Sequence, residues 1–207
     1  PMNIISEFEK SEKTSTLRSP TLSWTALLVQ TRDPLLSDIR IRRAIAHAID
    51  RQMIVNFNTY GYASVNSSGV PVAAASHSPV HDEWYSADVE KARQLLKEAG
   101  YRGQPVRIQA NRKYANMYAN AVVIQAMLHA AGFNAHIAVM DWASQLGTYY
   151  SGDYQLSAFS FSAQATPVMR YYKMIGDKDK RPVYMWENPE ALSLRDELLA
   201  TADETER

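Results

Sequence analysis

The pattern of hydrophobic and polar positions predicts strands and helices that alternate along most of the chain. Leu22–Val29 is a continuous apolar run with threonine and tryptophan, typical of a strand buried on both faces. Over about residues 38–56, apolar side chains recur every three or four positions, which predicts the longest helix. A short helix is expected within residues 3–13. A last helix is expected over about residues 189–202, because Asn188 and Pro189 form a helix-start signal.

Between these segments, a unit of helix, glycine, aromatic residue and strand occurs twice, with its glycines at Gly100 and Gly132. A third helix and strand follow, and in that strand the apolar phase changes at Phe159, which suggests a bulge or an exit into a loop. The expected elements are a helix at 88–99, a strand at 106–110, a helix at 115–131, a strand at 135–140, a helix at 142–150 and a strand at 154–161. This alternation predicts an α/β fold with a central sheet flanked by helices.

The organisation of the chain is expected to be simple. Residues 1–21 are interpreted as a lead-in helix and connector, and 22–207 as a single α/β lobe, because no linker divides them. Thr59–Tyr85 contains glycines, prolines and serines without periodic features. We expect it to form an ordered surface loop, and loops of this length usually carry function or cover something.

Composition excludes several classes of function. Hydrophobic residues make up 46% of the 207 residues and charged residues 21%, the balance of a folded, soluble chain. The formal net charge is zero, so no partner nucleic acid is expected. There is no cysteine, which removes thiol chemistry and cysteine-ligated metals. No apolar run approaches the roughly 20 residues that span a bilayer, and no signal peptide is visible.

Candidate chemistry is sparse among the ionisable residues. The phosphate-loop, nucleophile-elbow and zinc-protease motifs are absent from the sequence. His77 and His81 have helical metal-ligand spacing, but Pro79 lies between them in an expected loop, so no metal is expected.

Aromatic residues are more informative, because several follow the ends of the expected strands. In α/β sheets, ligands bind at the carboxyl ends of strands. The polar segment 160–166, which leaves the last strand there, supplies hydroxyls and an amide. The alternative is that the aromatic side chains simply form the core. The aromatic residues in question are Tyr114, Tyr118, Trp142, Tyr149, Tyr150, Phe159 and Phe161.

Four motifs in order resemble the extracellular solute-binding proteins of family 5, the peptide, opine and nickel receptors of ABC importers. Residues 38–51 resemble that family's D-x-R-V-R-x-A-I-x-x-A-I-D-R helix, and residues 88–101 its D-P-E-K-A-x-x-L-L-x-E-A-G-Y segment. Residues 141–143 resemble D-W-A, and residues 151–154 resemble x-G-D-Y-D. The similarity covers nearly all of residues 22–203.

The resemblance implies a two-lobed receptor of which this chain is the second lobe alone, excised or truncated from a larger protein. The receptor would hold a small solute between its lobes, without catalysis or cofactor, and deliver it to an ABC permease. It would lie in the periplasm or on the extracellular face. The lobes would close by a hinge, expected at Gln30, Thr31 and Arg32, where the first strand leaves the lobe.

The resemblance also implies ligand positions. Trp142 matches the family's tryptophan near the ligand, and Asn116 and Tyr149 match positions that face the cleft. The segment with Ser160, Phe161, Ser162 and Gln164 matches one that holds an aspartate for the ligand ammonium in peptide binders. Residues 159–167 contain no acid, and a buried ammonium without a carboxylate is costly. A sugar conjugate, opine or modified peptide therefore suits the segment better than an ordinary peptide.

Two other classes of function remain as alternatives. One is an α/β hydrolase domain with a serine and a histidine in its loops, although the sequence shows no nucleophile–base pair. The other is a protein-interaction domain built around residues 59–85.

Overall fold

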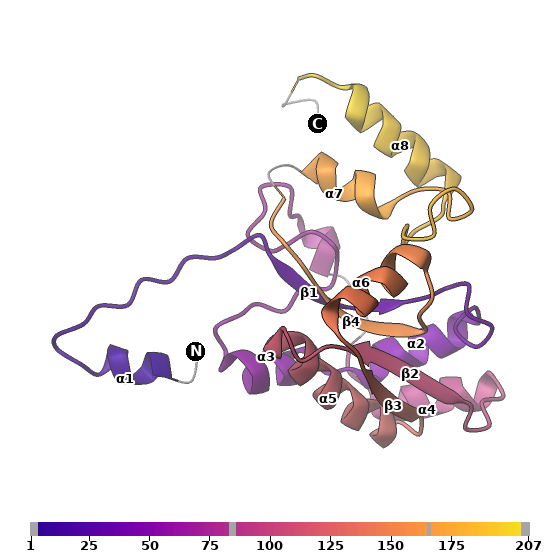
Figure 1. Cartoon of the computed structure of the whole chain (residues 1–207), viewed down its shortest axis with the longest axis horizontal. Coiled ribbons are helices and arrows are strands. Elements are labelled where there is room, and N and C mark those ends of the chain that lie inside the picture. The colour runs from indigo at the N-terminus through magenta and orange to yellow at the C-terminus, as the bar shows by residue number, and fades with distance from the viewer. Residues whose placement is uncertain (1–3, 83–85, 165–166, 204–207) are drawn as a thin grey trace.

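The computed structural model describes residues 4–82, 86–164 and 167–203, which form a mixed α/β fold (Figure 1). Four strands make one sheet in the order β1-β4-β2-β3, in which β1 is antiparallel to β4 and the other pairs are parallel. The elements are α1 Ile5–Glu9, β1 Trp24–Val29, α2 Ile39–Ala48, α3 Arg51–Thr59, α4 Val89–Glu98, β2 Pro105–Ala110, α5 Ala115–Ala130, β3 Asn134–Val139, α6 Trp142–Ser151, β4 Leu156–Phe161, α7 Pro167–Met174 and α8 Pro189–Ala200. The expected central mixed sheet flanked by helices is confirmed.

The sheet is covered on both faces by different sets of apolar side chains. The larger core joins α2, α4 and α5 to one face, with Ile41, Leu96 and Leu128 among its buried residues. A smaller core lies under α6 on the other face, where Tyr149 packs with Phe159. Burial on both faces is what drives these helices onto the sheet.

β4 takes part in both cores, and this explains the phase change in its sequence. Leu156 and Ala158 belong to the larger core, whereas Phe159 belongs to the smaller one. The strand pairs with β1 residue for residue, from Val29 opposite Leu156 to Trp24 opposite Phe161. The expected bulge is therefore wrong, because the strand is regular and apolar on two covered faces.

The first strand differs from its prediction in exposure. β1 lies at an edge of the sheet, and of its six residues only Leu28 is fully buried. The strand contacts a core on each face, through Leu27 and Val29 on one and Leu28 on the other, but its burial is only partial. A continuous apolar run does not reveal whether a strand has one neighbour or two.

The expected longest helix is divided in two. α2 ends at Ala48, Ile49 has an extended backbone, and Asp50 begins α3 by accepting a hydrogen bond from the amide of Met53. An aspartate in this position is a strong helix start, and it overrides the apolar periodicity that runs through it.

Residues 60–82 form the irregular segment expected there, except for a turn of 3-10 helix at Pro79–Asp82. Val70 and Pro71 are nevertheless buried, so part of the loop packs against the lobe. The lead-in helix α1 stands apart from the sheet at the end of an extended segment (Figure 1). Arg18 in that segment pairs with Glu9 and lies 4.2 Å from the ring centre of Tyr62. A domain boundary at residue 21 remains a prediction.

Candidate functional site

The connections of the sheet place a natural crevice between β2 and β4. The chain leaves β2 through α5 to reach β3, and returns through α6 to β4 on the other side of β2. α5 packs in the larger core and α6 against the smaller one, so the two helices cover opposite faces. Strand order reverses at this point, and ligands of open α/β sheets bind outside the carboxyl ends of the strands at such points.

A buried glutamine from α6 holds the two strands together at that point. Gln145 is fully buried, and its amide nitrogen donates to Ser157 Oγ and to the carbonyl of Ala158 on β4, both at 2.9 Å. Its side-chain oxygen accepts from Asn111 Nδ2 at 2.6 Å, at the end of β2. Asn111 Oδ1 in turn accepts from the amide of Tyr114, where α5 begins. The polar groups left by the diverging strands are thereby satisfied.

Aromatic side chains form a row along the same edge of the sheet. Trp142 lies 5.0 Å from Tyr114 and 5.4 Å from Phe159, centre to centre. Phe159 is 5.1 Å from Phe161, which stacks on Trp24 at 4.5 Å. Trp142 is partly buried against the smaller core. We call Tyr114, Trp142, Phe159, Phe161 and Trp24 the aromatic row.

The polar candidates lie beside this row. Asn116 Nδ2 donates to Ser160 Oγ at 3.1 Å, so two residues selected from the sequence are brought together between α5 and β4. Gln164 donates to the carbonyl of Ser162 at 3.4 Å and accepts from Lys173 Nζ at 3.1 Å. Ala165 and Thr166 lie outside the described residues.

The charged groups near this edge are mainly basic. Lys113 lies 5.8 Å from the ring centre of Tyr114, and the Arg170 guanidinium carbon lies 5.4 Å from that of Trp24. Asp141, at the start of α6, accepts hydrogen bonds from the amide and hydroxyl of Ser144. These hydrogen bonds lower the pKa of the Asp141 carboxyl, because they favour its ionised form.

Tyr149 does not join the exposed candidates. Its side chain is 7% exposed and packs within the smaller core. Burial raises the pKa of its phenol to about 12, as it does for neighbouring Tyr154. The expectation that Tyr149 faces the cleft is therefore corrected: its side chain lies in the core, on the apolar side of α6.

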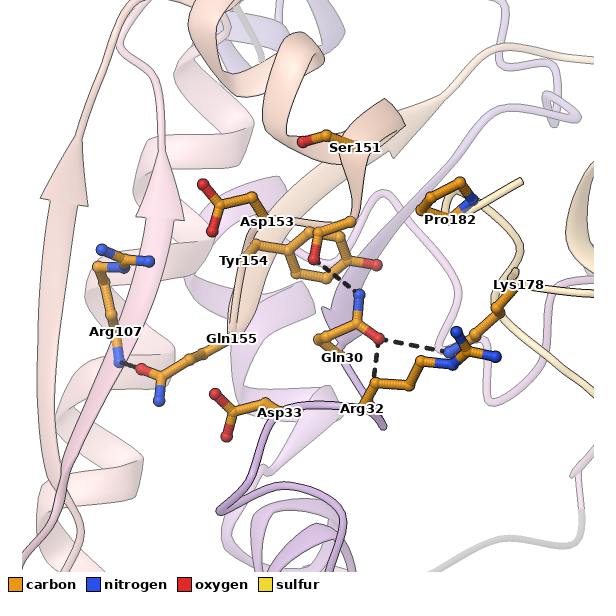
Figure 2. Close-up of a pocket in the computed structure, with 11 residues that line it drawn as sticks. Gln30, Arg32, Asp33, Arg107, Ser151, Asp153, Tyr154, Gln155, Lys178 and Pro182 are labelled. Atoms are coloured by element: carbon orange, nitrogen blue, oxygen red, sulfur yellow. Dashed lines mark hydrogen bonds between the residues drawn. The ribbon is translucent and has the colours of Figure 1, made fainter. Parts of the chain in front are cut away.

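The expected hinge residues lie at the other end of the sheet, around a polar depression of about 380 Å³ (Figure 2). Because β1 is antiparallel to β4, the last residues of β1 lie at the opposite end of the sheet from the aromatic row. Gln30 is 7% exposed and donates to the carbonyl of Gly152 at 2.9 Å. Thr31 accepts from Lys178 Nζ at 2.8 Å, and Arg32 pairs with Asp179 and Glu187. These contacts fasten the segment that precedes α8 to the lobe, and the hinge expected at these residues stays a prediction.

The histidines offer no catalytic arrangement that the structure describes. His47 Nδ1 lies 2.9 Å from the carbonyl of Ser86, and His129 Nε2 lies 2.5 Å from that of Ala135. Within residues 4–82, 86–164 and 167–203, no group of three or more metal-ligating side chains occurs.

A family of known proteins matches most of the chain. The sequence model described as bacterial extracellular solute-binding proteins, family 5 Middle, matches residues 1–182. The chain belongs to this family. The resemblance drawn from the four motifs is thereby confirmed, and the relatives are transport binding proteins rather than enzymes.

Two curated relatives are named as periplasmic binding proteins. A probable peptide ABC transporter periplasmic-binding protein of Sinorhizobium fredii, y4tO, is 31% identical over 111 residues, 51% of this chain and 21% of its own. The periplasmic oligopeptide-binding protein OppA of Escherichia coli is 22% identical over 193 residues, 86% of this chain and 34% of its own.

Solved family 5 structures share the fold along the whole chain. AgaA of A. tumefaciens R10, solved with agropinic acid, superposes with a TM-score of 0.80 at 28% identity, over 100% of this chain and 43% of its own. DppA of Helicobacter pylori, solved with the peptide STSA, has a TM-score of 0.84 at 22% identity, over 99% of this chain and 41% of its own. The chain therefore spans less than half of the length of each of these relatives.

Sequence reasoning missed the polar network beneath the aromatic row. Gln109, Asn111, Gln145 and Ser157 are each at most 2% exposed, and none of them stands out in the sequence as a candidate. The signal that could have found them is a polar residue placed in an apolar stretch at a strand end.

Across the described part of the chain, no helix is both long and apolar enough to cross a membrane.

Proposed function

We propose that this chain is the contiguous ligand-binding lobe of the substrate-binding protein of an ABC importer. It holds a small organic solute against the aromatic row and the Asn116–Ser160 pair, and a second lobe encloses that solute. The observation that carries the proposal is the convergence of aromatic and amide side chains on the switch point of a family 5 lobe. The solute-loaded receptor then delivers its cargo to a membrane permease.

The proposed solute exposes flat or apolar surface together with hydrogen-bonding groups. Aromatic side chains bind such surface well, and the Asn116–Ser160 pair supplies an amide and a hydroxyl group beside the row. Gln164 adds an amide in the segment that follows β4. AgaA was solved with agropinic acid and DppA with the peptide STSA, and the solute proposed here is comparable with these in size.

The flexible connection between lobes is proposed at residues 21–23 rather than at Gln30. These residues precede Trp24, the residue of β1 that pairs with Phe161 at the ligand edge. A chain that enters the lobe at this edge can change direction without disturbing the sheet, whereas Gln30 is held by its hydrogen bond to Gly152.

The test is retention of a solute by the receptor that contains this lobe. The receptor is purified from a periplasmic extract without denaturation, and the small molecule released on unfolding is identified by mass spectrometry. We expect Trp142→Ala to reduce the retained amount, because it removes the side chain that connects Tyr114 with Phe159 in the aromatic row. Tyr150→Ala, at the other end of the same helix and 57% exposed, is the matched control. Equal retention by both variants would contradict the proposed face.

A further inference from the structure

α7 carries a buried guanidinium that has no acidic partner among the residues that the structure describes. Arg170 is 6% exposed, and its one hydrogen bond is a long one, 3.5 Å from Nη2 to the carbonyl of Leu22. Among the residues that the structure describes, no carboxylate forms an ion pair with it. A buried charge is costly unless it is paired, and this cost is evident in the lowered pKa of Arg170, which desolvation causes.

A buried donor without an acceptor in the described part of the chain lies beside this guanidinium. The indole nitrogen of Trp24 is buried and has no hydrogen-bond partner within the described residues. The guanidinium carbon of Arg170 lies 5.4 Å from the centre of the Trp24 ring system. An unpaired buried donor is rare in folded proteins, so one that lies beside a buried guanidinium with a single long hydrogen bond calls for an explanation.

The position of this pair connects it to the proposed ligand edge. Trp24 is the first residue of β1 and stacks on Phe161, the last residue of β4, so the pair lies at the end of the aromatic row. Both groups are donors, and one of them is a cation. The described part of the segment after β4, residues 162–164, supplies no acid to neutralise it.

We propose that Arg170 and the Trp24 indole bind a carboxylate group of the solute. A guanidinium and a single N–H together match the two oxygens of one carboxylate, and charge-assisted hydrogen bonds are the strong ones. The inference rests on the proposed function and narrows it: the solute is an organic acid, and its carboxylate lies beside Phe161. The same residues disfavour an ammonium at this end of the row.

The test uses acetate as the smallest carboxylate probe. The four tryptophan indole N–H resonances of the 15N-labelled chain are followed by NMR, and that of Trp24 is assigned with Trp24→Phe. Sodium acetate is titrated at constant ionic strength against sodium chloride, with acetamide as the uncharged isostere. We expect the Trp24 resonance to shift saturably with acetate, with a dissociation constant of about 1–50 mM, and not with acetamide.

Three variants show whether Arg170 is the partner. Arg170→Met should weaken acetate binding by at least about tenfold, and Arg170→Lys, which keeps the charge without the planar fork, should weaken it less. Lys97→Met removes an exposed cation from α4 and should bind acetate as the unaltered chain does. If Arg170→Met does not fold, a weakened response in folded Arg170→Lys decides the question.

Several results would overturn the assignment: no saturable shift, an equal shift with acetamide, a stronger response to inorganic phosphate, or an unchanged response in the Arg170 variants. A carboxylate supplied by the rest of the receptor would leave Trp24 sensitive to acetate in this chain and insensitive in the solute-free receptor, which also overturns it. Retention of a neutral solute by the purified receptor would reject the acid and leave the proposed function standing.

Discussion

Replacing Gln145 by methionine tests whether the polar network between β2 and β4 determines the stability of the ligand edge. Methionine keeps the length and approximate volume of the side chain, so the change removes hydrogen bonds without opening a large cavity. It leaves the Ala158 carbonyl and the Ser157 hydroxyl without the amide that they share, and Asn111 Nδ2 with only a sulfur contact to Met117 at 3.1 Å.

The expected loss follows from the number of groups left buried without a partner. Each costs about 1–3 kcal/mol, and partial relaxation reduces the sum, so we expect a loss of about 2–5 kcal/mol in the free energy of unfolding. For a chain of this length, that corresponds to a fall in Tm of about 5–15 °C.

Urea unfolding followed by circular dichroism measures the effect, with the Ser157→Ala single variant and the double variant completing a mutant cycle. We expect the double variant to lose less than the sum of the single losses, because removing Ser157 Oγ also removes one unpaired group. A loss below about 1 kcal/mol for Gln145→Met, or strictly additive losses, would refute the reasoning that unsatisfied polar groups set the cost.

Three further outcomes are expected. Trp142→Ala should weaken solute binding about 5–150-fold, measured by calorimetry on the receptor, and should also lower the Tm of the chain, because Trp142 packs on Phe159 and the smaller core. Gly176→Ala should cost about 1–3 kcal/mol in urea unfolding, since an added Cβ would overlap the Tyr184 ring; a smaller cost would mean that the ring swings aside freely. The hydrogen-bonded Asp141 carboxyl has a lowered pKa, so its contribution to stability is present above its unfolded-state pKa and is lost as pH falls through its folded one. Asp141→Asn should therefore flatten the acid side of a Tm-against-pH curve, and an unchanged slope would count against this assignment.

The elements that the sequence predicted well are those with strong local signals. Asp88, Asp141 and Asn188 each begin a helix where expected, because their side chains accept from backbone amides within that helix. The order of helix and strand between residues 88 and 161 was also recoverable, since each helix is separated from the following strand by a glycine, at Gly100, Gly132 and Gly152.

The parts that the sequence could not predict depend on neighbours in space. Nothing local to Leu22–Val29 tells that β1 is an edge strand, or that it runs antiparallel and so carries Gln30 away from the ligand edge. Likewise, Tyr149 and Trp142 lie on one helix with similar local sequence signals, and only the position of β4 makes the first a core residue. Tertiary contacts of this kind override local pattern.

The pairing of β1 with β4 joins two strands that are synthesised at widely separated times. Trp24 pairs with Phe161 in the sheet, and Arg32, just after β1, forms an ion pair with Glu187. The first strand therefore reaches the ribosome exit long before its partners exist. At about 5–20 residues per second, roughly 7–27 s separate the synthesis of the two strands. During that interval the apolar run of β1 has no sheet to join, and an unpaired apolar strand is a site of aggregation. The nascent lobe therefore has a defined period of vulnerability that ends only when β4 emerges, and a chaperone that recognises extended apolar segments would act on β1 within it.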